Sequence, residues 1–349
     1  MSIKVVNADR LDANLTSIAN AIRAKGGTSA SLTFPTGFIS AINDISGGSS
    51  VDVQPLSISA NGTYAAPTGT AYSPITVSVS SSGGNDNEDK IIMGTISGAY
   101  TNDRVTKIKT CAFASCTSIA EINFPNVTTI ESSAFWYCPK LTTATFAACK
   151  SIGYTAFNAC GSLTTISFPE VTNISNAAFS GCSNLMQVSF PKCRNIGASA
   201  FSFCKKLTSA YFPSCVSIST YAFYLCSALT NISFPECSYI GTHAFERCSN
   251  LTEVSFPKCS RIASNAFTSC TKLEAAFFDI CSEINIYAFQ YCTSLQSVYL
   301  LSSSVTAVYA NTFSGASIPL FYVPASLVDS YKSATNWVAY SDRITAYTE

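Results

Sequence analysis

A phenylalanine recurs every 22 residues over most of the chain, and this period constrains the fold more than any other feature. Each member of the series follows an alanine. The members are Phe113, Phe135, Phe157, Phe179, Phe201, Phe223, Phe245, Phe267 and Phe289. The next equivalent, Phe313, comes after 24 residues, so we expect a small insertion in the last repeat. A fixed period of this length predicts a solenoid whose repeats each form one turn.

Each repeat also contains a strand-like segment with the pattern Leu-x-x-Ile-x-Phe, in which apolar and polar residues alternate. Proline often follows, as at Pro125 and Pro169, and ends the strand because it cannot donate a ladder hydrogen bond. We predict one parallel strand per repeat on a concave face, and a short 3₁₀ or irregular turn around each Ala-Phe pair. One repeat alone buries too little, since each apolar side chain contributes roughly 1.5–3 kcal/mol and ordering each residue's backbone costs about 1–2 kcal/mol. The repeats must therefore stack.

Fifteen of the sixteen cysteines fall on two ladders of the repeat. The first ladder follows each phenylalanine by three residues, and its members are Cys116, Cys138, Cys160, Cys182, Cys204, Cys226, Cys248, Cys270 and Cys292. On the second ladder, which includes Cys149, valine stands in other repeats, as at Val127. This exchange favours free thiols in a core. Disulfides remain an alternative, because stacked strands lie about 4.8 Å apart. Cys111, which is off both ladders, is the cysteine that we expect to be reactive.

The period and consensus resemble the BspA-like leucine-rich repeats of bacterial surface and phage-associated proteins. The resemblance covers Ile108 to about Phe313, in nine or ten repeats. It implies a leucine-rich-repeat solenoid over residues 108–316, and it leaves the ligand open, because one repeat fold serves many functions.

The N-terminal part of the chain differs from the repeats. Residues 1–48 have helical spacing and are expected to attach to a partner or to form a homo-oligomer, because two short helices make a small core. The phrase ADRLDANLTSIANAIRAKGGTSASLTFPTGF within them resembles the N-terminal segments of phage and prophage structural proteins of Gram-positive bacteria. Residues 49–82 are expected to form a small β module, which also resembles a module of phage tail-associated proteins, and residues 83–90 a polar linker.

A solenoid needs a cap at each end to cover its core. We expect residues 91–107 to form a hairpin-like N-terminal cap, and residues 317–349 to form the C-terminal cap. In the latter, residues 326–334 suit a short helix, and the spacing of Ser326 and Asp329 suggests a variant capping box. Trp337 and Tyr340 are expected to pack there.

Composition and motifs exclude several classes of function. Net charge is zero and only 11% of residues are charged, which argues against a nucleic-acid partner. No apolar run approaches the roughly 20 residues of a membrane helix, so membrane insertion is not expected. The single histidine, His243, takes a variable position of the repeat, and we expect no catalytic residues, metal or cofactor.

The outward positions of the predicted strands offer the candidate ligand-binding residues. Most of these positions hold small polar residues, but Tyr211, Phe277 and Tyr299 are aromatic. An exposed aromatic on a sheet face suits contact with a sugar or a protein. The alternative is that these rings only cover a neighbouring surface.

Together these features predict a non-enzymatic binding or structural protein. The leading hypothesis is a virion-associated phage or prophage component, such as a tail fibre, baseplate appendage or receptor-binding protein. It would contact other virion proteins through residues 1–48 and a host cell-surface protein or glycan through the repeats. Residues 1–10 have no secretory pattern, which fits particles assembled in the bacterial cytoplasm. The alternative is a bacterial cell-surface adhesin of the BspA type.

Overall fold

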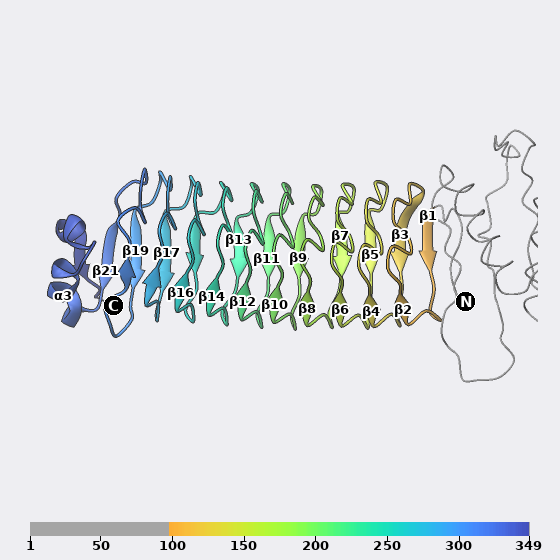
Figure 1. Cartoon of the computed structure of the whole chain (residues 1–349), viewed down its shortest axis with the longest axis horizontal. Helices are drawn as coiled ribbons and strands as arrows, with labels where there is room; N and C mark the ends of the chain where they lie inside the picture. The colour runs from red at the N-terminus through yellow and green to blue at the C-terminus, as the bar shows by residue number, and fades with distance from the viewer. Residues whose placement is uncertain (1–97, 349) are drawn as a thin grey trace, which may run out of the picture.

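The computed structural model describes residues 98–348, which form a β-solenoid of stacked turns (Figure 1). We call each turn of about 22 residues a rung. In Figure 1 the rungs stand in a nearly straight row, and the C-terminal helix α3 (Val328–Ser333) lies at one end. The segments predicted over residues 1–48, 49–82 and 83–90 lie outside the described residues.

The longer strand of most rungs lies within the Leu-x-x-Ile-x-Phe segment. The predicted parallel pairing of these strands is confirmed. Successive strands pair in register, so that Ser209 lies opposite Asn231 one rung later. Hydrogen bonding divides these strands into sheets with the orders β1-β3-β5-β7, β13-β11-β9 and β15-β17-β19-β21-β22. We call their outward side the broad face. The strands are β1 (Gly98–Thr101), β3 (Ile119–Asn123), β5 (Thr143–Thr145), β7 (Thr165–Ser167), β9 (Gln187–Ser189), β11 (Ser209–Tyr211), β13 (Asn231–Ser233), β15 (Glu253–Ser255), β17 (Ala275–Phe278), β19 (Ser297–Leu300), β21 (Leu320–Val323) and β22 (Ile344–Ala346).

Each rung also has a second, two-residue strand, which the repeat pattern did not predict. These strands form one continuous ten-stranded parallel sheet, which we call the narrow sheet. Each strand has one outward residue and one buried isoleucine or valine, too short a segment to show an alternation in the sequence. The strands are β2 (Lys107–Ile108), β4 (Thr129–Ile130), β6 (Ser151–Ile152), β8 (Asn173–Ile174), β10 (Asn195–Ile196), β12 (Ser217–Ile218), β14 (Tyr239–Ile240), β16 (Arg261–Ile262), β18 (Glu283–Ile284) and β20 (Ala307–Val308).

A compact turn around the Ala-Phe pair closes each rung, and we call this third side the turn edge. Its backbone also bonds between rungs: the N–H groups of Ser133, Phe135 and Tyr137 donate to carbonyls one rung later, at 2.8, 2.7 and 2.8 Å. Ser133 and Tyr137 have φ of 54° and 52°, and equivalent residues of the other rungs are also left-handed. The turn is irregular, as the sequence predicted.

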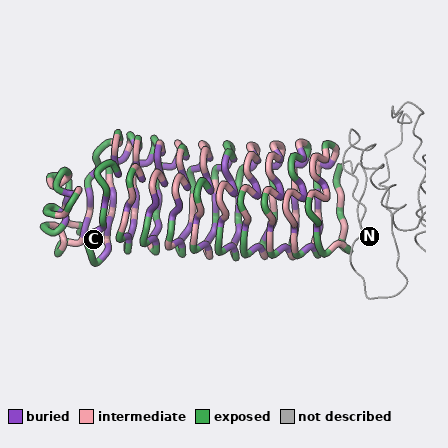
Figure 2. Tube along the Cα trace, in the orientation of Figure 1, coloured by how far each residue is buried: buried purple, intermediate pink, exposed green. Residues whose placement is uncertain are grey.

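The core is a stack of nearly identical layers (Figure 2). The rung that begins at Leu141 buries eight side chains, namely Leu141, Ala144, Phe146, Cys149, Ile152, Ala156, Phe157 and Cys160. The phenylalanines form two ladders in which each ring stacks on its equivalent, as in Phe201–Phe223 at 5.3 Å and 8°. Rings of different ladders meet edge to face, as in Phe212–Phe223 at 6.0 Å and 74°. Such offset and edge contacts are the geometries that aromatic rings prefer.

The cysteines are free thiols, and fourteen of the sixteen are buried. First-ladder thiols donate to the phenylalanine carbonyl of the preceding rung, as from Cys226 Sγ to Phe201 O at 3.1 Å. Second-ladder thiols donate to the carbonyl two residues ahead, as from Cys193 Sγ to Asn195 O at 3.3 Å. Cys111 and Cys116 are partly exposed.

The predicted hairpin over residues 91–107 lies partly outside the described residues, and the predicted C-terminal helix is present as α3. At the N-terminal end, residues 98–107 contain no hairpin: β1 runs parallel to β3 and continues the sheet, and Tyr100 packs on Phe124 at 5.6 Å. At the C-terminal end, a 3₁₀ helix, η2 (Ala325–Leu327), leads into α3. Neither helix has a side-chain capping hydrogen bond, so the predicted capping box is wrong.

Buried aromatic residues close the C-terminal end. Trp337 meets Phe321 edge to face at 4.9 Å, and Tyr340 packs beside both. The indole of Trp337 donates from Nε1 to Thr306 O at 2.7 Å, and the hydroxyl of Tyr331 donates to Thr306 Oγ1 at 3.0 Å. A further 3₁₀ helix, η3 (Val338–Arg343), then leads to β22.

Candidate functional site

The broad face carries a row of stacked aromatic side chains at its C-terminal end. Phe277 of β17 stacks on Tyr299 of β19 with ring centroids 4.3 Å apart and planes 10° apart. Tyr299 in turn stacks on Tyr322 of β21 at 4.6 Å and 9°. The parallel register causes this, because equivalent outward positions of successive strands lie side by side. We call Phe277, Tyr299 and Tyr322 the aromatic row.

Two of the three predicted aromatic residues therefore lie together, and the third does not. Tyr211 is in β11, three strands before Phe277, and its direct neighbours are Ser189 and Ser233. Its side chain is isolated and 47% exposed. A site that uses several rings at once includes the aromatic row and leaves Tyr211 out.

Tyr322 was missed as a site residue because the insertion in the last repeat breaks the period. It follows Tyr299 by 23 residues, and only the observed pairing of β19 with β21 places the two rings together. Tyr347, beyond β22, adds an edge-to-face contact with Tyr299 at 5.9 Å. The row is thus larger than the repeat pattern indicated.

The rings at the two ends of the row are each stacked on one face only, and the outer neighbour of Tyr322 is Thr345 of β22. Tyr299 lies between two rings, so both of its faces are occupied. Phe277 is stacked on one side only, and its neighbour on the other side is Ser255 of β15, whose side chain is small. A flat apolar group, such as the hydrocarbon face of a sugar or another aromatic side chain, can stack on this face of Phe277.

The turn edge carries a second aromatic cluster, which was not predicted from the sequence. Phe203 meets Tyr224 edge to face at 5.4 Å, and Tyr224 meets Tyr221 in the same way at 5.4 Å. Tyr221 stacks on His243 at 4.5 Å and 4°. The cluster lies in the turns, whereas the predicted binding residues are all on strands.

His243 lies in this cluster and is paired with a carboxylate. Its Nδ1 is 2.5 Å from Oε2 of Glu246, and Oε1 of Glu246 is 3.7 Å from Nε of Arg247. Within residues 98–348, no group of three or more histidine, cysteine or acidic side chains is placed to hold a metal ion.

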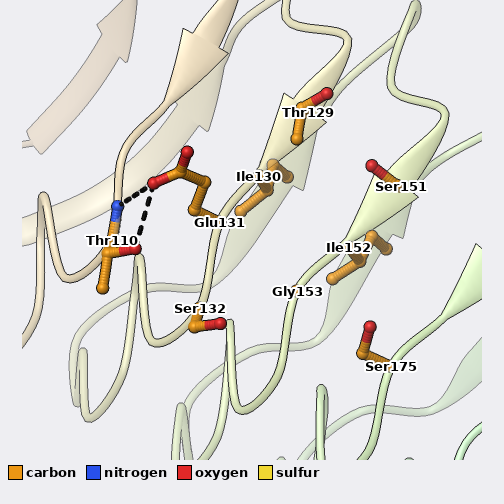
Figure 3. A pocket seen from close by; sticks show the side chains of 9 residues that line it. All are labelled: Thr110, Thr129, Ile130, Glu131, Ser132, Ser151, Ile152, Gly153 and Ser175. Atoms are coloured by element: carbon orange, nitrogen blue, oxygen red, sulfur yellow. Dashed lines mark hydrogen bonds between the residues drawn. The ribbon is translucent and has the colours of Figure 1, made fainter.

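A shallow depression lies at the N-terminal end of the narrow sheet (Figure 3). Its lining includes Ile130, Ile152 and Gly153, with Glu131 at one side. The carboxylate of Glu131 accepts hydrogen bonds from the N–H and hydroxyl of Thr110 at 2.8 and 3.0 Å and pairs with Lys107 at 2.6 Å. Lys107 and these hydrogen bonds lower the pKa of Glu131 to about 2. The carboxylate is already satisfied within the protein, so it does not indicate a ligand.

No helix within residues 98–348 is both long enough and apolar enough to cross a membrane.

Comparison with known families finds one match, which covers most of the chain. A model described as the BspA type leucine rich repeat region matches residues 95–208, 150–274 and 216–337. No curated protein sequence matches significantly.

Several solved structures are similar to this chain. One is a leucine-rich cell surface protein from Faecalibacterium prausnitzii A2-165, with 22% identity over 74% of this chain and 89% of that chain, and a TM-score of 0.40. Another is a leucine-rich repeat protein from Bacteroides ovatus, with 20% identity over 70% and 88% of the two chains and a TM-score of 0.36. A third is the leucine-rich repeat protein of T. pallidum, with 21% identity over 57% and 83% and a TM-score of 0.37.

Proposed function

Since this chain belongs to the family of proteins with BspA-type leucine-rich repeats, we propose that it is a non-enzymatic binding protein displayed on the bacterial cell surface. The solenoid is the rigid support, and the broad face is the recognition surface. Such a support is stiff, because two continuous phenylalanine ladders run through it and hydrogen bonds join neighbouring rungs on all three sides. A rigid support lowers the entropy cost of binding, because side chains are already held in place.

The observation that carries this proposal is the aromatic row. Phe277, Tyr299 and Tyr322 are partly exposed rings on a face whose other outward residues are mostly small and polar. Exposed aromatic residues are enriched at the centres of binding sites, where they contribute large contact areas at low entropy cost. The phenolic groups of Tyr299 and Tyr322 add hydrogen-bonding capacity at the edge of the row.

The partner class that fits this surface is a host cell-surface glycan or protein. The free face of Phe277 suits stacking, and the neighbouring residues Ser255, Ala275 and Ser297 leave room above the sheet. The surface near the row has no lysine or arginine among the outward residues of β15, β17 and β19, and Glu253 is acidic. A neutral sugar or a neutral to basic protein surface is therefore favoured over an anionic one.

The alternative is display on a phage particle rather than on a cell. It is supported by the likeness of the segment within residues 1–48 to phage and prophage structural proteins. In that case the same broad face would contact the host bacterium, and residues 1–48 would attach the chain to other virion proteins or to further copies of itself.

Two experiments test the proposal. Flow cytometry of the labelled full chain on epithelial and bacterial cells is expected to show binding that Phe277→Ser weakens about tenfold, while Tyr211→Ser, the matched change at the equivalent position of an isolated ring, leaves it unchanged. Equal binding by both variants and the unaltered chain would show that the aromatic row is not the binding site. Immunogold labelling of intact producing cells and of particles purified from an induced culture then separates the two locations.

A further inference from the structure

The turn-edge cluster is a continuous surface that spans three consecutive rungs. Its ring contacts run from Phe203 through Tyr224 and Tyr221 to His243. Phe203 and Tyr221 are 43% and 36% exposed, although large aromatic side chains are usually covered. Rings held in this way present apolar surface to a ligand without reorganisation.

The polar groups of the cluster place acceptors and donors side by side. One oxygen of Glu246 pairs with His243, and the other faces the guanidinium of Arg247 at 3.7 Å. Arg247 is the more exposed partner, with 57% of its side chain accessible against 16% for Glu246. Glu246 is mostly covered and already paired, so it holds His243 and Arg247 in place, and a carboxylate of a ligand can bind the exposed guanidinium.

The charge around the cluster is positive. The three turn-edge segments, residues 197–207, 219–229 and 241–251, contain three cations and one acidic residue. The cations are Lys205, Lys206 and Arg247, and the acidic residue is Glu246. Lys205 and Lys206 are exposed and follow Phe203 in the same turn. The outward residues of the broad face in these rungs include Glu253 and no cation, so an anionic partner is directed to the turn edge.

We propose that this cluster, formed by Phe203, Tyr221, Tyr224, His243, Glu246 and Arg247, is a binding site for an acidic polysaccharide. The rings contact the apolar faces of the sugars, and Arg247 with the two lysines binds uronate carboxylates, while Glu246 holds His243 and Arg247 in place. The three rungs span two strand spacings, roughly 9.6 Å, so the cluster contacts a short stretch of a polymer. Polyphosphate has no apolar face for the rings to contact, so it should bind more weakly than a uronate polymer.

The repeat itself supplies substitutions that keep the fold. Tyr221, His243 and Arg247 all have positive φ, and the equivalent positions in other rungs, also with positive φ, hold Ser199, Asn265 and Ser269. The triple variant Tyr221→Ser/His243→Asn/Arg247→Ser therefore puts into each turn a side chain that the same backbone already accommodates. The matched control is Tyr291→Ser, which changes an exposed ring at the Arg247 position two rungs later.

The test is biolayer interferometry of the full chain on immobilised hyaluronate and polygalacturonate, with neutral dextran and polyphosphate as comparison surfaces. We expect binding to at least one uronate polymer, little to dextran, and a Kd raised tenfold or more by the triple variant, because it removes a charge-assisted contact and two rings. Tyr291→Ser and Phe277→Ser should bind as the unaltered chain does. No binding to either uronate polymer, an unchanged Kd for a triple variant with native circular dichroism, or equal affinity for polyphosphate would overturn the assignment.

Discussion

The buried thiol ladders predict that the solenoid unfolds in mildly alkaline solution. The pKa is raised for thirteen of the sixteen cysteines. Burial among apolar side chains is the main cause, except at Cys138, where the neighbouring thiol of Cys160 contributes more. In the second ladder, burial raises the pKa of Cys149, Cys193, Cys237 and Cys281 to about 12.

The sign and size of the effect follow from proton linkage. An unfolded cysteine ionises with a pKa near 8.5, whereas the folded ladder thiols stay protonated, so the unfolded state binds fewer protons and stability falls as the pH rises. The thiols thus contribute fully to the free energy of unfolding below about pH 8. This contribution falls as the pH rises from the unfolded pKa of about 8.5 towards the folded pKa values. One unit of pKa corresponds to about 1.4 kcal/mol, so at pH 10 each protonated thiol costs on the order of 2 kcal/mol, and the thirteen together cost on the order of tens of kcal/mol. A domain of this size has a stability of about 12–38 kcal/mol.

Far-UV circular dichroism against pH, with a phosphine reductant present, measures this transition. We expect a steep loss of strand signal between pH 9 and 10. A variant with valine at the six second-ladder cysteines should unfold about half a pH unit or more higher, because fewer buried thiols remain, and valine already stands on that ladder at Val127 and Val171. A strand signal and a urea midpoint that stay constant to pH 10.5 would show that the buried thiols do not destabilise the fold at high pH. Identical transitions for the unaltered chain and the valine variant would show the same.

Three further outcomes follow from the packing. At pH 7.5, a thiol reagent should label at most Cys111 and Cys116 in the folded chain and all sixteen cysteines in guanidinium, and rapid labelling of more than two under native conditions would contradict the buried ladders. Phe223→Ala should lower the free energy of unfolding in urea by about 3–5 kcal/mol, against under about 1.5 kcal/mol for Phe223→Leu, since this ring is fully buried between four others. Tyr331→Phe should cost about 1–3 kcal/mol in the same assay, because the N–H of Thr306 donates to this buried hydroxyl at 2.9 Å, and an unchanged stability would show that the C-terminal network is not formed.

The repeating part of the fold was predictable because each core position recurs with the period. Both phenylalanine ladders and the longer strands follow from residues such as Phe201 and Phe212, whose environments are copied from rung to rung. The C-terminal end was less predictable, because the buried Thr306 bonds to Tyr331 and Trp337, which lie outside the repeats. The predicted capping box at Ser326 failed because the chain enters α3 through a 3₁₀ turn.

The candidate sites depend on geometry that single positions do not reveal. Phe277 and Tyr299 were found because parallel strands align residues 22 apart, but Tyr322 needed the observed register after the insertion. The turn-edge cluster depends on left-handed residues such as Tyr221 and His243, whose backbone conformation directs their side chains outward together. Non-glycine residues adopt this conformation rarely, so the sequence alone gives no reason to expect it.

The most direct test of recognition through the aromatic row is a graded binding titration on the cells that the full chain labels. Phe277→Ser, then Phe277→Ser/Tyr299→Ser, then the triple change that adds Tyr322→Ser, remove one ring at a time from the broad face. The apparent Kd should rise at each step, by a few-fold to about tenfold per ring, while the urea midpoint of the solenoid changes little. An unchanged Kd for the folded triple variant would contradict the claim that this row is the recognition surface.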